Sequence, residues 1–168
     1  MTFLPPLELE KTAMDLIASH SSEALIHFSG QVSALGSKLF IAFLVIGLWQ
    51  LKKRETSVEL AVSALIANLA TTLLKVIIER PRPETTVYTL THSFPSGHAA
   101  TAFAAAATLS LRYPKLRYLF FVIASLVGLS RVVLQAHYPL DVLFGAAVGL
   151  ASAYLTERYV ETSDIFKT

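Results

Sequence analysis

Three short groups of polar and ionisable residues lie at the ends of apolar stretches of this chain. Charged side chains at such positions are costly in a membrane helix and generally mark a functional site. The groups are Lys75 with Arg82-Pro83, then Pro95-Ser96-Gly97-His98, then Ser130-Arg131 with His137 and Asp141. Their chemistry indicates a site that binds and transfers an anionic group.

The cations and the backbone near these groups are suited to phosphate. Guanidinium groups bind phosphate oxygens in pairs and lysine adds a point charge, so Lys75, Arg82 and Arg131 are candidate phosphate-binding residues. Ser96 and Gly97 lie where a loop becomes a helix, and we expect their backbone N–H groups to be unpaired and to face the anion. Gly97 also lets a phosphate approach the backbone closely.

The two histidines can supply covalent and acid–base catalysis. Asp141 follows His137 by four residues, and Pro139 between them suits the first turn of a helix. The carboxylate can hold one imidazole nitrogen of His137 and leave the other nitrogen as the nucleophile. His98 then donates a proton to the leaving oxygen. These roles predict a phosphohistidine intermediate that water hydrolyses.

Metal catalysis, cofactors and nucleic acid are not expected. A two-metal phosphatase site needs several clustered carboxylate or imidazole ligands, and the acidic and histidine residues near these groups lack a ligand-like spacing. The chain has no cysteine, which excludes disulfides and thiolate metal sites. Its net charge of +2 is too small to indicate nucleic acid binding.

The composition and the apolar stretches indicate a membrane protein. Hydrophobic residues make up 54% of the chain, the mean hydropathy is +0.56, and charged residues make up 15%, against about 25% in an average soluble domain. Five apolar stretches without strand-like alternation approach or reach the roughly 17–25 residues of a spanning helix. They are residues 35–51, 58–78, 97–113, 116–134 and 139–155. We therefore predict an all-α integral membrane bundle of five transmembrane helices.

The N-terminal segment has a different pattern. Residues 7–28 mix apolar side chains with Glu8, Glu10, Asp15 and Glu23, which is typical of an amphipathic helix or helix pair at the membrane interface. A sixth spanning helix is the alternative, and it would bring four acidic residues into lipid. We divide the chain into an interfacial segment (1–34), a transmembrane core (35–157) and a cytoplasmic tail (158–168). The sequence shows no cleavable signal peptide.

Basic residues predict the orientation in the membrane. Many of them lie after the first and third apolar stretches and in the tail: Lys52, Lys53, Arg54, Arg112, Lys115, Arg117, Arg158 and Lys167. The positive-inside rule places them in the cytoplasm. With five spans, the three polar groups then lie on the extracytoplasmic side and the C-terminus lies in the cytoplasm.

Together the three groups resemble the motifs of the type 2 phosphatidic acid phosphatase superfamily. These motifs are Lys-x6-Arg-Pro, Pro-Ser-Gly-His and Ser-Arg-x5-His-x3-Asp, and the resemblance covers about residues 58–155. In that family the last histidine is the nucleophile, the histidine of the second motif is the acid, and no divalent metal is needed. The resemblance implies these roles for His137 and His98. Many members have Tyr and Gly where this chain has Val133 and Gln135.

The resemblance also implies a substrate class and a location. We expect hydrolysis of a phosphate monoester or diphosphate on a membrane lipid, at the periplasmic or exterior face of the cell (inner) membrane, with no obligatory protein partner. Phosphatidylglycerophosphate, undecaprenyl diphosphate and the 1-phosphate of lipid A are the leading substrates. The alternatives are a lipid phosphotransferase of the same family, a phosphatase of soluble substrates, and a non-catalytic membrane binding or transport protein.

Residues beside the motifs are given lesser roles. Arg80-Pro81 duplicates the ending of the first motif, and only the six-residue spacing selects Arg82. We expect Arg80 to contact solvent or lipid headgroups. A headgroup contact is a weaker possibility for His92. The small residues of 99–107 predict a face of close helix packing.

Overall fold

The computed structural model describes residues 4–83 and 92–162, and all regular structure within those ranges is helical. The helices are α1 (Glu8–His20), α2 (Glu23–Ala34), α3 (Lys38–Gln50), α4 (Arg54–Ile78), α5 (Gly97–Arg112), a short 3-10 turn η1 (Pro114–Leu116), α6 (Arg117–Val133) and α7 (Pro139–Thr162). The predicted all-α class is confirmed.

Local sequence signals set several of the helix ends. Ser22, Ser37 and Ser96 stand just before α2, α3 and α5, and each side chain accepts a hydrogen bond from a first-turn backbone N–H. Helix α4 ends at Glu79, which has the left-handed backbone conformation, and its N–H donates to the carbonyl of Lys75. The prolines at 81 and 83 follow, so the chain leaves α4 extended.

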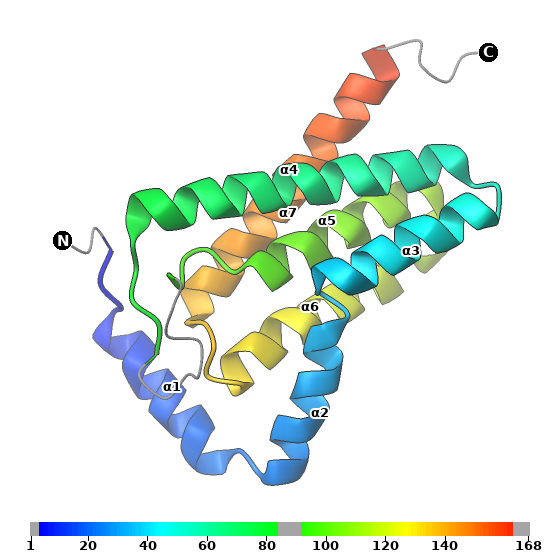
Figure 1. Cartoon of the computed structure of the whole chain (residues 1–168). Coiled ribbons are helices and arrows are strands. Elements are labelled where there is room, and N and C mark those ends of the chain that lie inside the picture. The colour runs from blue at the N-terminus through cyan, green and yellow to red at the C-terminus, as the bar shows by residue number, and fades with distance from the viewer. Residues whose placement is uncertain (1–3, 84–91, 163–168) are drawn as a thin grey trace.

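Helix α5 lies at the centre of the bundle, in contact with α4, α6 and α7 (Figure 1). Six of its alanines are buried: Ala99, Ala100, Ala102, Ala104, Ala105 and Ala106. Gly149 of α7 packs on the backbone of α5 near Ala100 and Ala104, so closely that an added Cβ would overlap it. The small residues therefore form the close packing face that the sequence predicts.

The structure gives three or four candidate membrane spans among the described residues, compared with the five predicted from the sequence. Among the residues that the structure describes, three helical stretches are long and apolar enough to cross a bilayer: Arg54–Ile78, Pro114–Val133 and Pro139–Val160. Helices α2 and α3, which meet at a 46° bend, give a fourth if the pair is one broken span. Helix α5 has 16 residues, and at 1.5 Å per residue it is about 24 Å long. Its neighbours bury much of it, so it does not need a full lipid-facing length.

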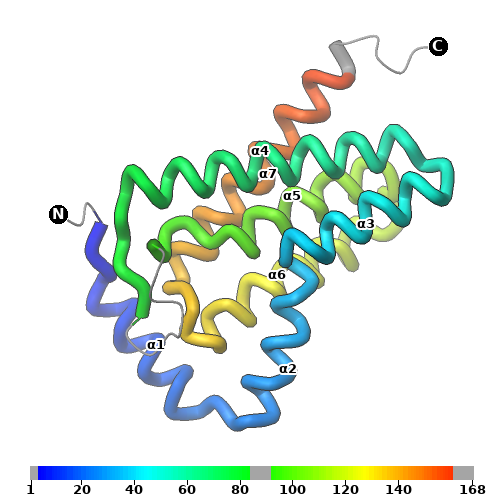
Figure 2. The backbone as a smooth tube through the Cα atoms, in the orientation of Figure 1, coloured from blue at the N-terminus to red at the C-terminus, as the bar shows by residue number. Residues whose placement is uncertain are grey.

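The N-terminal segment forms the expected helix pair. Helices α1 and α2 make a V at one end of the bundle (Figures 1 and 2). Leu9 and Leu16 of α1 are exposed, whereas Met14 is buried against Val132 and Tyr138, which flank the turn between α6 and α7. One face of α1 therefore packs on the bundle and the other remains open.

Candidate active site

The three sequence groups meet at one end of the bundle. Helices α4 and α6 run toward this end, and α5 and α7 start there, so the end of one pair faces the beginning of the other (Figure 1). The connections α3–α4 and α5–α6, with their basic residues, lie at the opposite end. Consecutive antiparallel helices are what bring together residues more than 60 positions apart.

His137 lies in the turn that joins α6 to α7 and is almost fully buried. The backbone N–H groups of Ala136 and His137 both donate to the carbonyl of Arg131, at 3.0 and 3.3 Å. Gln135 has a positive φ of 53°, the left-handed conformation that favours glycine. This tight turn fixes the direction of the imidazole.

Arg82 lies beside the candidate nucleophile. Its Nη1 donates to the carbonyl of Ala136 at 2.7 Å and lies 3.4 Å from Nε2 of His137. The guanidinium is thus held beside the imidazole nitrogen that points away from Asp141. A phosphate bound to Arg82 would lie next to this nitrogen.

Lys75 and Arg131 are anchored around the same space. The Lys75 ammonium donates to the carbonyls of His92 and Ser93, at 2.8 and 3.1 Å, and so ties α4 to the loop before the second motif. Arg131 is buried and donates to the hydroxyl of Ser33 at 2.6 Å. The charges of Lys75, Arg82 and Arg131 all act on His98, which places the second histidine among the three cations.

Ser96 has a different role from the one expected. Its backbone N–H is not unpaired, because it donates to the carbonyl of Asp141 at 2.8 Å. Its hydroxyl caps α5 by accepting from the N–H of Ala99, and the residue has no exposed surface. Ser96 therefore fastens the start of α5 to the start of α7 and does not present this amide to an anion. Gly97, which follows it, is partly exposed, and a Cβ added there would make an ordinary van der Waals contact with the hydroxyl of Thr71 at 3.9 Å.

Asp141 is close to His137, and its carboxylate has two further partners. Its Oδ2 lies 3.5 Å from Nδ1 of His137 and accepts from the N–H of Tyr138 at 2.9 Å. Its Oδ1 accepts from Arg80 at 2.5 Å. The Nδ1 atom makes no hydrogen bond in the structure; catalytic hydrogen bonds are often long until substrate is bound.

The expectation for Arg80 was wrong. Arg80 has no exposed surface, so it contacts neither solvent nor lipid headgroups. Its guanidinium pairs with Asp141 and with Glu10 of α1, and it stacks over the ring of Tyr138 at 4.7 Å. Burying a guanidinium is tolerated only when charges and hydrogen bonds compensate it, and these two carboxylates do so.

Burial determines the charge of His137. Desolvation, together with the nearby charges of Lys75 and Arg82, lowers the pKa of His137 to about 4, although Asp141 opposes this shift. The imidazole is therefore neutral at physiological pH. A neutral imidazole has the free lone pair that a nucleophile requires.

The donor set near the site does not resemble a metal centre. Within residues 4–83 and 92–162, no three His, Asp or Glu side chains are grouped so that they could hold a metal ion. The charged groups around His137 are mainly cations, which repel a divalent ion and attract an anion.

Comparison with known proteins agrees with this geometry. The family model described as the PAP2 superfamily matches residues 56–164. The chain belongs to the PAP2 superfamily. The matched region contains all three motifs, and it leaves α1, α2 and α3 outside.

Individual PAP2 proteins are similar over different lengths. The chain is 37% identical to a lipid A 1-phosphatase of Rhizobium johnstonii over 106 residues. This alignment covers 56% of this chain and 42% of that protein. The chain is 33% identical over 125 residues to an undecaprenyl-diphosphatase of Sulfolobus acidocaldarius, 69% of this chain and 61% of that protein. The chain thus spans less than two thirds of these relatives.

A solved structure is similar over nearly the whole chain. The crystal structure of Aquifex aeolicus LpxE aligns with a TM-score of 0.82 at 28% identity, covering 95% of this chain and all of that one. The likeness extends the PAP2 fold to the N-terminal helices that the family model omits.

Sequence reasoning missed three residues that support the site. Glu10 and Ser33 lie in the amphipathic segment, where single acidic and hydroxyl residues are ordinary surface choices. Arg80 was seen and assigned to the surface. A partial signal existed, because Arg80 is a charged residue next to a spanning helix, and such residues generally have a partner.

Proposed function

We propose that this PAP2 protein hydrolyses the phosphate monoester or diphosphate headgroup of a membrane lipid through a phosphohistidine on His137. The observation that supports this most directly is the juxtaposition of Nε2 of His137 with the guanidinium of Arg82 at 3.4 Å. A nucleophilic nitrogen beside a phosphate-binding cation is the minimum needed for attack on phosphorus.

The proposed reaction has two steps. Nε2 attacks phosphorus while the bond from phosphorus to the lipid oxygen breaks, and His98 gives its proton to that oxygen. Water then attacks the phosphorus of the phosphohistidine, the bond between phosphorus and Nε2 of His137 breaks, His98 accepts a proton from the water, and inorganic phosphate leaves. Lys75, Arg82 and Arg131 balance the charge of the phosphoryl oxygens in both steps, and Asp141 stabilises the charge that forms on His137.

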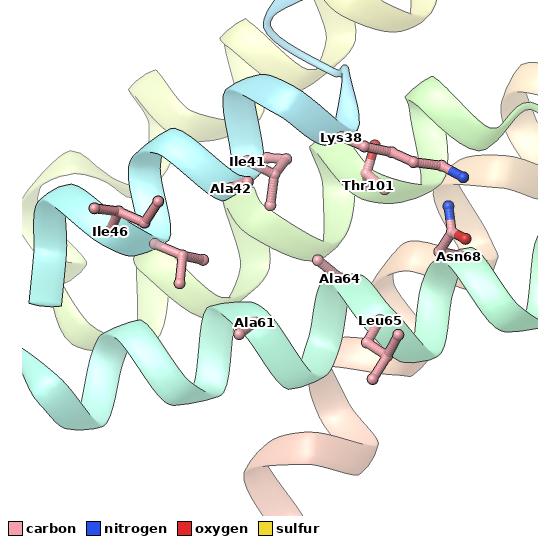
Figure 3. Close-up of a pocket in the computed structure, with 10 residues that line it drawn as sticks. Lys38, Ile41, Ala42, Ile46, Ala61, Ala64, Leu65, Asn68 and Thr101 are labelled. Atoms are coloured by element: carbon pink, nitrogen blue, oxygen red, sulfur yellow. The ribbon is translucent and has the colours of Figure 1, made fainter.

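A groove in the membrane-facing surface supports a lipid substrate. It has a volume of about 400 Å³, lies between α3 and α4, and is largely apolar, with Ile41, Ala64 and Leu65 in its walls. Its polar end reaches Lys38, Asn68 and Thr101, and Figure 3 shows the Lys38 ammonium and the Asn68 amide turned toward each other there. Thr101 is one turn of α5 beyond His98, so a lipid chain in the groove would start near the site.

The proposed location is the extracytoplasmic face of the membrane. The basic connections lie at the end of the bundle opposite to the site, and the positive-inside rule assigns that end to the cytoplasm. The named relatives act on lipid A and undecaprenyl diphosphate, so both compounds belong in the first substrate panel, together with phosphatidylglycerophosphate.

The test is phosphate release from this panel by the detergent-solubilised protein in EDTA. We expect turnover by wild type and a loss on the order of 10³-fold or more for His137→Ala, because the attacking atom is gone. His20→Ala, on the exposed face of α1, is the matched control and should retain full activity. Activity retained by His137→Ala would exclude His137 as the nucleophile. Activity abolished by EDTA would exclude a metal-independent reaction.

A further inference from the structure

Glu10 lies on the amphipathic helix α1, and its side chain is buried at the active-site end of the bundle. It has 5% of its surface exposed. One carboxylate oxygen accepts from Arg80 and from the N–H of Leu7, the latter at 3.0 Å. The other accepts from the N–H of Leu140 at 3.1 Å. A single side chain thus joins α1, the segment after α4, and the first turn of α7.

The contact with Leu140 is a helix cap supplied by another helix. Leu140 is the second residue of α7, and N–H groups in a first helical turn have no partner within their own helix. Asp141, the next residue, is the carboxylate beside the nucleophile. Glu10 therefore fixes the turn of α7 from which Asp141 projects.

Through Arg80, Glu10 also affects the electrostatic environment of the Asp141 carboxylate, because Arg80 binds its Oδ1. Arg80 binds Asp141 through Nη1 and Glu10 through Nη2. Without Glu10, the full positive charge of Arg80 would fall on Asp141 and largely cancel it. With Glu10, the three groups carry a net charge of −1, and one Asp141 oxygen stays directed at Nδ1 of His137, 3.5 Å away. A net negative charge there favours the imidazole that turns cationic during attack.

We propose that Glu10 and Arg80 are positioning residues for phosphoryl transfer, and that α1, outside the matched PAP2 region, is thereby a required part of the active site. This assignment rests on the proposed function. Neither residue touches the phosphate; they act through Asp141 on the orientation and charge of His137.

Other contacts allow this role to be separated from simple folding. The Gln135 side chain donates to the carbonyl of Met14 at 3.2 Å, and Met14 packs on Val132 and Tyr138. These contacts hold α1 on the bundle without Glu10. A change of Glu10 to Gln keeps the size and removes the charge. It also replaces one of the two accepting oxygens with an NH2 group, so either the contact with Leu140 or the contacts with Arg80 and Leu7 lose their acceptor.

The experiment compares Glu10→Gln, Glu10→Asp and Arg80→Lys with wild type on the most active lipid of the panel. Measured quantities are kcat, KM, the rate of phosphoenzyme formation in single turnovers, and the melting temperature. We expect Glu10→Gln to lower kcat and the phosphorylation rate by roughly 10–100-fold, the size of effect that follows from small misplacement of reacting groups. KM should stay within about twofold, because the phosphate-binding cations are untouched. Glu10→Asp, which keeps the charge, should recover part of the loss.

Two control variants each share one property with Glu10. One carboxylate lies on the same helix, and the other is buried in an ion pair with an arginine. Glu8→Gln removes an exposed carboxylate of the same helix, which pairs only with Lys11 in the described structure. Glu59→Gln removes a buried carboxylate that binds Arg112 at the opposite end of the bundle. Both should keep wild-type kcat, even where Glu59→Gln lowers the melting temperature.

The outcomes separate this inference from the function on which it rests. Wild type without turnover on any lipid overturns the proposed function and this assignment with it. Active wild type with unchanged kcat in Glu10→Gln overturns the assignment alone. The same holds if Glu10→Asp is no better than Glu10→Gln at equal melting temperature, or if Glu59→Gln loses as much kcat as the Glu10 variants.

Discussion

The chemistry of the site depends on how single side chains are held. His137 is buried among cations, beside a carboxylate that already serves Arg80 and the N–H of Tyr138. The environment keeps the imidazole neutral, and in the proposed mechanism it provides negative charge for the cation that attack on phosphorus would create. In the proposed mechanism, these surroundings therefore suit both the neutral and the cationic state of His137.

The ionisation of His137 can be tested directly. Burial and nearby cations lower its pKa from 6.5 to about 4, so the imidazole should stay neutral at pH 5.5, where an exposed histidine is mostly protonated. Histidine NMR signals of the labelled protein in detergent, assigned by their loss in His137→Gln, measure this. Titration of that signal near pH 6.5 would contradict the buried, neutral nucleophile.

The lowered pKa of His137 also predicts how the stability of the folded protein changes with pH. The unfolded chain binds the proton of this histidine more tightly than the folded protein does. The contribution of neutral His137 is therefore complete above pH 6.5 and is lost as pH falls toward 4. In His137→Gln this part of the acid sensitivity should be absent.

At the scale of elements, close packing of α7 on α5 aligns the first turns of the two helices. Ser96 and Asp141 join these turns through a backbone hydrogen bond of 2.8 Å. Gly145 approaches the carbonyl of Ser96, and Gly149 approaches α5 one turn further along α7. The register of the two helices therefore sets the distance between the second and third motifs.

The glycine contact gives an element-scale prediction. In an open helix, glycine to alanine raises helix stability, by up to about 1 kcal/mol. At Gly149 an added methyl overlaps the backbone of α5, with the N atom of Ala104 at 2.8 Å, and overpacking costs about 1–3 kcal/mol. Gly149→Ala should therefore lower the melting temperature and activity. Gly47→Ala, with no atom within 4 Å of the new methyl, should do neither; equal melting temperatures for the two variants would refute the packing argument.

At the scale of the molecule, the bundle has two chemically different ends. One carries the cations of the candidate site and the V of α1 and α2, and the other carries the basic connections and the Glu59–Arg112 pair (Figure 1). By the positive-inside rule, this asymmetry predicts the orientation of the protein in the membrane.

The absence of cysteine from the sequence makes the orientation simple to measure. Single cysteines at two exposed sites, Glu8→Cys near the site and Lys115→Cys at the opposite end, report one face each. In intact cells a membrane-impermeant maleimide should label Glu8→Cys, and it should label Lys115→Cys only after permeabilisation. The reverse pattern would place the candidate site in the cytoplasm.

The sequence by itself determined the all-α class and predicted the residues of the candidate site, and at the N-terminus it predicted an amphipathic helix or helix pair. Apolar stretches and capping serines depend on neighbouring residues, so they can be read locally. The motif spacing indicated His137, Arg82 and Lys75 for a similar reason, since each motif is a short run of the chain at a helix end and the adjoining turn or loop.

Only the tertiary structure decided how these residues are paired. Arg80 was expected at the surface and Ser96 was expected to offer a free amide, but contacts with residues 45 to 70 positions away gave both a different role. Glu10 looks like any acid of an amphipathic helix until α1 packs against the end of α6 and the first turn of α7. The burial and the partners of a charged side chain depend on which helices meet, and no local pattern of residues encodes that.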